Sequence, residues 1–138
     1  WGAFYESGGV VVANRYTTSN AVHQASKLLP EERRDFLDWL FDLEYRRLGL
    51  PEPDLVLYLD MPTEAANRLM RRREEKTNTQ ADIHERDGDY LRRCRECAGE
   101  IARAQGWTVV SCAREGVPRT PEDIHQEALA IVLDRLSR

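Results

Sequence analysis

The 138-residue chain lacks any apolar run close to the ~20 residues that a membrane-spanning helix needs. It has only three cysteines, and this odd number argues against a secreted disulfide framework and favours a reducing cytoplasm. Its formal net charge of -4 gives no bulk electrostatic reason to expect nucleic-acid binding. These features predict one soluble, cytoplasmic domain over residues 1–138 that binds neither membranes nor nucleic acids.

The sequence also has little that indicates metal or redox chemistry. Cys94 and Cys97 form a CxxC motif, but no second CxxC and no pair of histidines at zinc-ligand spacing accompanies it. Cys94 shares a predicted helical stripe with Leu91 and Ile101, so core packing explains it better than metal binding. The motif GxxxxGK[ST], which cradles a nucleoside triphosphate, does not occur in the chain.

Three short apolar runs are typical of strands that are covered on both faces, as in a parallel sheet. They lie at residues 10–13, 55–59 and 107–112. Helices are predicted around them, at residues 17–28, 30–48, 62–75, about 84–106 and from 120 to the carboxyl end. This alternation predicts an α/β fold with a parallel sheet and flanking helices. Three strands are few for such a sheet, so further strands are expected before Trp1.

The predicted helix at 30–48 is apolar over much of its circumference, including Phe36, Trp39, Phe41 and Leu43. A helix that packs against one core needs a single apolar stripe. The excess predicts a second buried face, which we interpret as a subunit contact in a homodimer.

Asn14, Arg15 and Tyr16 directly follow the first predicted strand. Ligands of open parallel sheets bind at the carboxyl ends of the strands, and an arginine presents a planar fork of donors that suits a phosphate. We therefore expect Arg15 to bind a small anion. Alternatively, it forms an ion pair with a neighbouring acidic residue.

The helix that follows carries a polar face. Asn20, His23 and Gln24 have i, i+3, i+4 spacing and lie close to Ser19. An amide side chain can read both a donor and an acceptor on a nucleobase edge, so this face is a candidate nucleotide site. Such a face can also simply be solvated.

A cationic cluster ends the predicted helix at 62–75 and precedes a polar loop. Its members are Arg68, Arg71, Arg72, Arg73 and Lys76. Arg68 and Arg72 share one helix face, and cations beside a loop suit a lid, at about 68–86, that closes over phosphates. They equally suit a solvated helix end. Asp82 and His84 follow the loop and either cap the next helix or hold the closed lid.

Four segments, taken in order, resemble the carboxyl-terminal two-thirds of the thymidylate kinase family. They are VVVANRYTTSNAVHQ, PEPDLVLYLDMPTEAANRLMRRR, ADIHERDGDYLRR and the WTVVSC strand with the final helix. The resemblance implies a P-loop nucleoside monophosphate kinase fold whose first strand and P-loop are missing from this chain. It also implies transfer of the ATP γ-phosphoryl group to dTMP to give dTDP, with Mg2+, by a homodimer.

The resemblance assigns a role to each candidate residue. It implies that Arg15 holds the monophosphate and that Asn20 reads the thymine edge. His23 takes the position of a tyrosine near the ribose 2′ carbon, with Gln24 beside it. Arg68 and Arg72 match the lid arginines, with Arg73 and Lys76 also on the ATP side. Asp82 and His84 match an Asp-x-Tyr pair after the lid.

The chain departs from the family pattern in ways that leave other functions open. Asn14 replaces an aspartate and so loses a charge that would organise Mg2+ and its waters. Because the glycine-rich loop is absent, we expect the 138 residues alone to be inactive. The alternatives are a related P-loop kinase with another deoxynucleoside or nucleotide acceptor, or a non-catalytic remnant that serves as a binding or assembly module.

Overall fold

The computed structural model describes residues 1–77 and 88–137. The first half is mostly helical, with α1 (Gly2–Glu6), α2 (Thr17–Ala25), a 3-10 turn η1 (Pro30–Glu32), α3 (Arg33–Phe41) and a π-helical turn η2 (Asp42–Arg47). The second half contains β1 (Leu57–Asp60), α4 (Thr63–Thr77), α6 (Gly88–Gln105), β2 (Thr108–Ser111), β3 (Ala113–Arg114), β4 (Val117–Pro118) and α7 (Pro121–Leu136).

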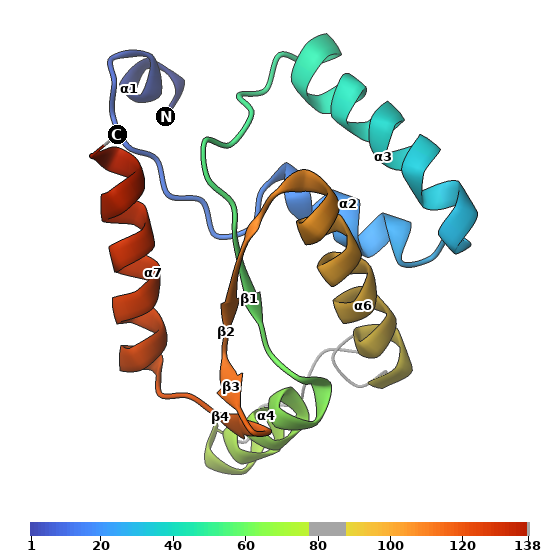
Figure 1. Cartoon of the computed structure of the whole chain (residues 1–138), viewed down its shortest axis with the longest axis vertical. Coiled ribbons are helices and arrows are strands. Elements are labelled where there is room, and N and C mark those ends of the chain that lie inside the picture. Colours follow the sequence, from blue (N-terminus) through green and yellow to red (C-terminus); the bar gives the residue numbers. More distant parts are fainter. Residues whose placement is uncertain (78–87, 138) are drawn as a thin grey trace.

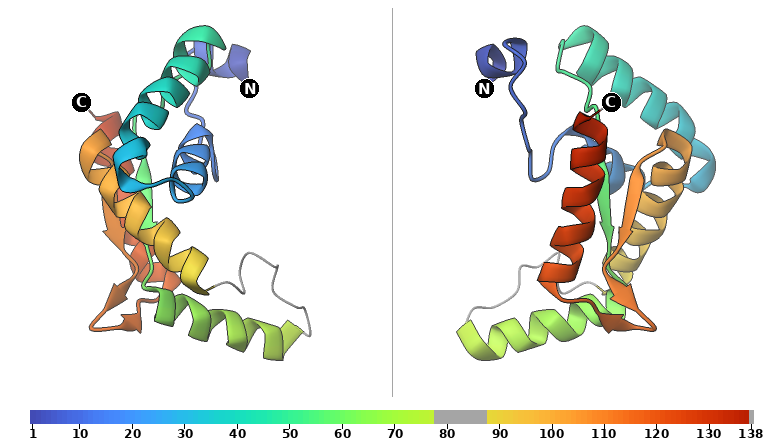
Figure 2. Two further views of the ribbon diagram at one scale, coloured as in Figure 1. Left: turned by 90° about the vertical axis from the view of Figure 1, so that its right-hand side faces the viewer. Right: turned by 60° about the vertical axis from the view of Figure 1, so that its left-hand side comes forward.

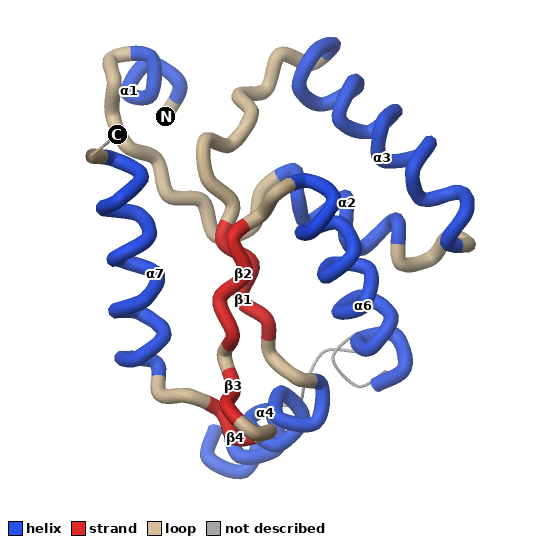
Figure 3. Tube along the Cα trace, in the orientation of Figure 1, coloured by secondary structure: helices blue, strands red, loops and turns tan. Residues whose placement is uncertain are grey.

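The two main strands form a parallel pair in the middle of the molecule (Figure 3). Leu57 lies opposite Thr108 and Asp60 opposite Ser111. Helix α7 lies on one side of this pair, while α2, α6 and α3 lie on the other (Figure 1). The crossover from β1 to β2 through helices gives the parallel α/β arrangement that the alternating pattern predicted.

The strand predicted at residues 10–13 is wrong. These residues form an extended connection that belongs to neither sheet, and Val12 is 87% exposed. A strand needs a hydrogen-bonded neighbour, and within the described residues β1 pairs with β2 alone. The β-branched residues of this run favour a strand, but no described strand lies beside the run to pair with it.

The core lies between α2, α3 and α6 and is built from small and aliphatic side chains. Its buried members are Ala21, Ala25, Leu37, Leu40, Cys97 and Ile101. Burial raises the pKa of the Cys97 thiol, as expected when the charged form loses its solvation. Both cysteines of the CxxC motif are buried free thiols, so the prediction of core packing is confirmed.

The predicted helix at 30–48 is three consecutive segments, η1, α3 and η2. Leu37 and Leu40 face the core, whereas Trp39 is 55% exposed. Phe36 and Phe41 pack against the same core, so of the predicted excess only Trp39 is exposed, and a subunit contact there stays a prediction. In the described part of the chain, no helix combines the length and the apolarity needed to span a membrane.

The carboxyl-terminal region contains one predicted and one unpredicted feature. The helix predicted from residue 120 is α7, and Thr120 caps it, since its hydroxyl accepts a hydrogen bond from the Asp123 backbone N–H at 3.2 Å. The β3–β4 hairpin was not predicted. Its turn is formed by Glu115 and Gly116, with φ angles of 49° and 76°, and successive left-handed residues are what a tight hairpin turn requires.

Candidate functional site

Arg15 adopts an unusual backbone conformation immediately before α2. Its φ angle is 68°, in the left-handed region that costs a residue with a side chain about 1–2 kcal/mol. The Tyr16 hydroxyl donates to the Pro51 carbonyl at 3.1 Å, and this contact fixes the entry into α2. Strain of this kind often marks a functional position.

The Arg15 guanidinium is held by two side chains of α2. Its Nε donates to the Ser19 hydroxyl at 3.3 Å, and its Nη2 donates to His23 Nε2 at 2.8 Å. No carboxylate lies within ion-pair distance of Arg15 in the parts of the chain that the structure describes. The alternative of an acidic partner is thus not observed there, and the positive charge remains open to an anion.

His23 connects this segment to α6. Its Nδ1 lies 3.1 Å from the Tyr90 hydroxyl, and the two rings stack with centroids 6.2 Å apart. The sulfur of Cys94 lies 3.7 Å from the same nitrogen. Burial raises the pKa of Tyr90, so its hydroxyl stays protonated at neutral pH. Sequence reasoning missed Tyr90 because nothing in its local pattern separates it from an ordinary helix residue.

Asn20 and Gln24 do not share the contacts of His23. Asn20 Nδ2 donates to Glu44 Oε1 at 2.9 Å, whereas Gln24 is exposed and accepts from Lys27 Nζ at 3.3 Å. Glu44 is 6% exposed, and its Oε2 has no partner among the described residues. Because a carboxylate only accepts, Glu44 fixes which end of the Asn20 amide faces it.

The predicted lid arginines lie away from Arg15. Helix α4, which carries them, follows the carboxyl end of β1, whereas α2 lies level with the amino ends of the strands (Figure 2). Arg68 Nη2 donates to the Gly116 carbonyl of the hairpin at 2.5 Å. Arg72 and Arg73 are exposed on α4. The Lys76 side chain, Asp82 and His84 lie outside the described residues.

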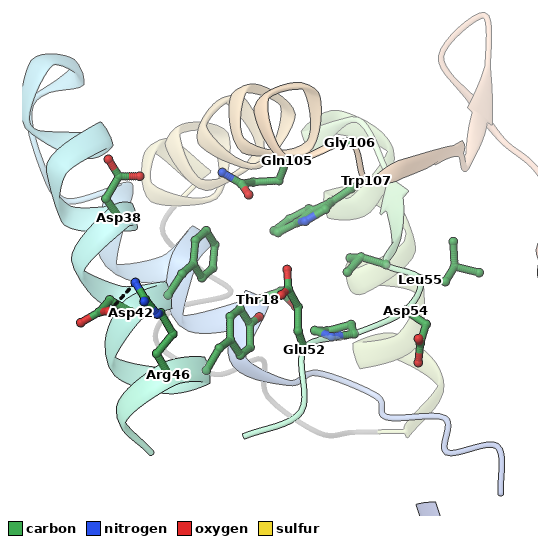
Figure 4. A pocket seen from close by; sticks show the side chains of 14 residues that line it. Thr18, Asp38, Asp42, Arg46, Glu52, Asp54, Leu55, Gln105, Gly106 and Trp107 are labelled. Atoms are coloured by element: carbon green, nitrogen blue, oxygen red, sulfur yellow. Dashed lines mark ion pairs between the residues drawn. The ribbon is translucent and has the colours of Figure 1, made fainter. Parts of the chain in front are cut away.

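A cavity of about 460 Å³ lies elsewhere in the described residues and has the wrong charge for a phosphate (Figure 4). Its walls include four carboxylates and three aromatic rings, from Asp38, Asp42, Glu52, Asp54, Phe41, Tyr45 and Trp107. Arg46 is the one cationic side chain in its wall, and it pairs with Asp42 at 3.5 Å. An anionic ligand would be repelled here, so this cavity does not suit a phosphate.

Among the described residues, none is arranged as a ready-made site for ATP or Mg2+. Within the described ranges, no cluster of three or more histidine, cysteine or acidic side chains is arranged to hold a metal. The sequence has no glycine-rich loop with its lysine. The described geometry offers an oriented cation, Arg15, and an oriented amide, Asn20, on the segment that begins α2.

Comparison with known proteins agrees with this chemistry. The family model for thymidylate kinase matches residues 4–126. The thymidylate kinases of two strains of Mycobacterium tuberculosis are each 35% identical over 99 residues, which is 71% of this chain and 46% of each relative. The chain spans about half the length of these relatives. The extent of the family match and the identity together place the chain in the thymidylate kinase family.

Proposed function

We propose that this chain forms the acceptor-binding part of a dTMP kinase and that Arg15 binds the monophosphate of dTMP. The observation that carries the proposal is the Arg15 guanidinium, which is fixed by Ser19 and His23 and has no carboxylate within ion-pair distance in the described residues. A phosphate monoester is mostly dianionic at neutral pH because its second pKa is ~6. It therefore gains most from a planar, permanently charged partner.

The base would be read by Asn20. Its contact with Glu44 leaves the amide oxygen and the second N–H available. Thymine offers a donor and an acceptor next to each other on its pairing edge, so an amide of fixed orientation complements it. Glu44 thereby supports base recognition from η2 without contacting the nucleotide.

Transfer of the γ-phosphoryl group from ATP to dTMP, giving dTDP, is proposed for a protein in which this chain is joined to a P-loop. ATP supplies the phosphoryl group, and Mg2+ would offset its charge. The contribution of this chain is to bind and orient the acceptor. A dianionic acceptor oxygen needs no general base, so the lack of a nucleophile–base pair is consistent with this role. Arg68, Arg72, Arg73 and Lys76 are proposed to reach the phosphates only after α4 moves.

The contacts of His23 favour one alternative, a related kinase with a broader acceptor range. His23 faces Arg15 and Tyr90, so it is occupied by these contacts rather than placed to test a ribose 2′ hydroxyl. We therefore expect the protein to discriminate less between deoxyribose and ribose nucleotides than between thymine and other bases. We further propose that the protein forms a homodimer through the exposed surface around Trp39. We also propose a cytoplasmic location, which is consistent with the three free thiols.

Calorimetric titration of the full-length protein with dTMP, dUMP, UMP and thymidine tests the proposal. We expect dTMP to bind most tightly and Arg15→Ala to weaken dTMP binding by about 100-fold, the effect of losing two hydrogen bonds to a charged group. Thymidine, which lacks the phosphate, should bind the variant and the parent protein equally. Equal dTMP affinity in the two proteins would remove the phosphate role from Arg15.

A coupled assay tests the division of labour. The 138 residues alone should show no transfer from ATP to dTMP, and ordinary turnover by them would contradict the proposal.

Sedimentation of the full-length protein with and without Trp39→Glu tests the dimer, which the substitution should dissociate.

A further inference from the structure

We propose that Tyr90 is a positioning residue for the acceptor phosphate. Through His23 it would fix the orientation in which Arg15 presents its guanidinium. This inference rests on the proposed function and extends it to α6. Among the described contacts, α6 reaches the candidate site through Tyr90 and Cys94. The contacts that carry it are Tyr90 Oη to His23 Nδ1 at 3.1 Å and His23 Nε2 to Arg15 Nη2 at 2.8 Å.

The proton positions follow from the groups involved. A guanidinium has only N–H donors, so His23 Nε2 must accept from Arg15. A neutral imidazole then carries its hydrogen on Nδ1, which faces the Tyr90 hydroxyl. Tyr90 is therefore the acceptor, and this contact selects the tautomer whose free lone pair faces Arg15. Cys94 Sγ, at 3.7 Å from Nδ1, is a weaker acceptor that favours the same tautomer.

The contacts also determine which edge of the guanidinium is free. Nε and Nη2 form one side of the fork, and that side is occupied by Ser19 and His23. The outer edge, formed by Nη1 and the second N–H of Nη2, has no partner in the described part of the chain. Two parallel N–H groups are the arrangement that binds a phosphate in two places. Loss of the His23 contact would let the fork rotate and lose this alignment.

The packing of α2 against α6 makes Tyr90 a firm support. Ala21 and Ala25 of α2 share the core with Cys97 and Ile101 of α6. The stacked rings of His23 and Tyr90, inclined by 26°, continue that contact toward Arg15. The hydroxyl position is thus fixed by two packed helices rather than by a loop.

Tyr90→Phe tests the inference because it removes the hydroxyl and keeps the ring. In the full-length protein we expect dTMP to bind about fivefold more weakly, the effect of one neutral hydrogen bond, and thymidine to bind unchanged. In an Arg15→Ala background the same substitution should have no further effect on dTMP. The matched control is Tyr58→Phe, another partly buried tyrosine, which lies on β1 and should leave both affinities unchanged. Equal weakening of dTMP and thymidine, or no weakening of either, would overturn the inference.

The nitrogen-15 spectrum of His23, assigned with a His23→Gln variant, provides a measurement that needs no loss of affinity. We expect the Nδ1–H tautomer in the parent protein and a shift toward the Nε2–H form in Tyr90→Phe. A parent spectrum with the Nε2–H tautomer would overturn the inference even if Tyr90→Phe failed to fold. The two proposals fail separately: unchanged dTMP binding by Arg15→Ala refutes the phosphate site, whereas a large Arg15 effect with no Tyr90 effect refutes only the positioning role.

Discussion

Arg15 and Arg95 show two opposite uses of the same side chain. Arg95, on α6, binds Asp60 at the end of β1 through two parallel hydrogen bonds of 2.6 Å and 2.9 Å. Arg15, before α2, is held by a hydroxyl and an imidazole. The first charge is neutralised within the protein and ties a helix to a strand. The second is oriented without being neutralised, which is the condition for binding an anion from solution.

Helix α6 serves both regions. Tyr90 lies near its amino end and contacts His23, and Arg95 follows five residues later and contacts Asp60. Five residues along an α-helix turn the side chain by about 140°, so the two point in clearly different directions. One rigid element therefore supports a binding region and a structural region at once, and their substitutions should affect different properties.

The largest effect that separates the two regions should come from Arg15→Gly. We expect dTMP affinity to fall about 100-fold, because two charge-assisted hydrogen bonds are lost. Glycine adopts a positive φ angle freely, so the free energy of unfolding should rise by about 0.5 kcal/mol despite the added flexibility of the unfolded chain. Titration calorimetry and urea unfolding measure the two quantities. A destabilised variant would mean that Arg15 has a structural role like that of Arg95.

Alkaline unfolding should show the second-largest effect, in the region of Arg95. Burial, followed by the charge of Asp60, raises the pKa of Tyr58 to about 12 from 10.0. Because the folded-state pKa is the higher one, the stabilisation is complete below pH 10 and is lost as the pH rises toward 12. Tyr58 should account for about 2 kcal/mol of the stability that the parent protein loses over this interval, after a reduction for solvent screening.

The control for this pH effect is Tyr58→Phe, whose stability should fall less over the same interval. Other tyrosines, including Tyr16 and Tyr45, also have raised pKa values because of burial. Only the difference between parent and variant therefore reports on Tyr58. Identical alkaline profiles for the two proteins would show that Tyr58 is solvated in both states.

Arg95→Ala should have a smaller effect on stability. The Arg95 side chain is 40% exposed and that of Asp60 25%, so solvent weakens the pair, but its two-point geometry retains about 1 kcal/mol. We expect urea unfolding to show this loss, with dTMP affinity unchanged. Asp60→Asn is the matched control, since it removes the opposite charge and keeps the shape. A fall in dTMP affinity in either variant would contradict the separation of the two regions.

The sequence allowed the local features to be predicted but not the partners that come from distant segments. The strand cores at β1 and β2, the start of α7 at residue 120 and the proximity of Arg15, Ser19 and His23 depend on residues close in sequence. Tyr90 and Glu44 lie 67 and 24 residues from the side chains that they contact. No local periodicity specifies such pairings, because they are set by how helices pack.

The strand predicted at residues 10–13 failed for a related reason. Propensity describes what a segment prefers, whereas a strand also requires a neighbour. The β3–β4 hairpin shows the converse, since it has only two residues per strand and such short strands give almost no pattern from which to predict them.

The smallest expected effect is that of Asn14→Asp, which tests whether dTMP binding depends on the absence of a negative charge near Arg15. Asn14→Asp places a carboxylate next in sequence to Arg15 and so gives it a nearby negative charge of the kind that Arg95 has. A unit charge close by in water is worth about 0.5 kcal/mol, and salt reduces it. Without Mg2+, we expect dTMP to bind about twofold more weakly at low ionic strength, with the difference disappearing at high salt. Asn14→Ser is the control that adds no charge. Tighter binding of dTMP by Asn14→Asp in the absence of metal would show that the Arg15 charge is not what attracts the phosphate, because an added anion could only reduce that attraction.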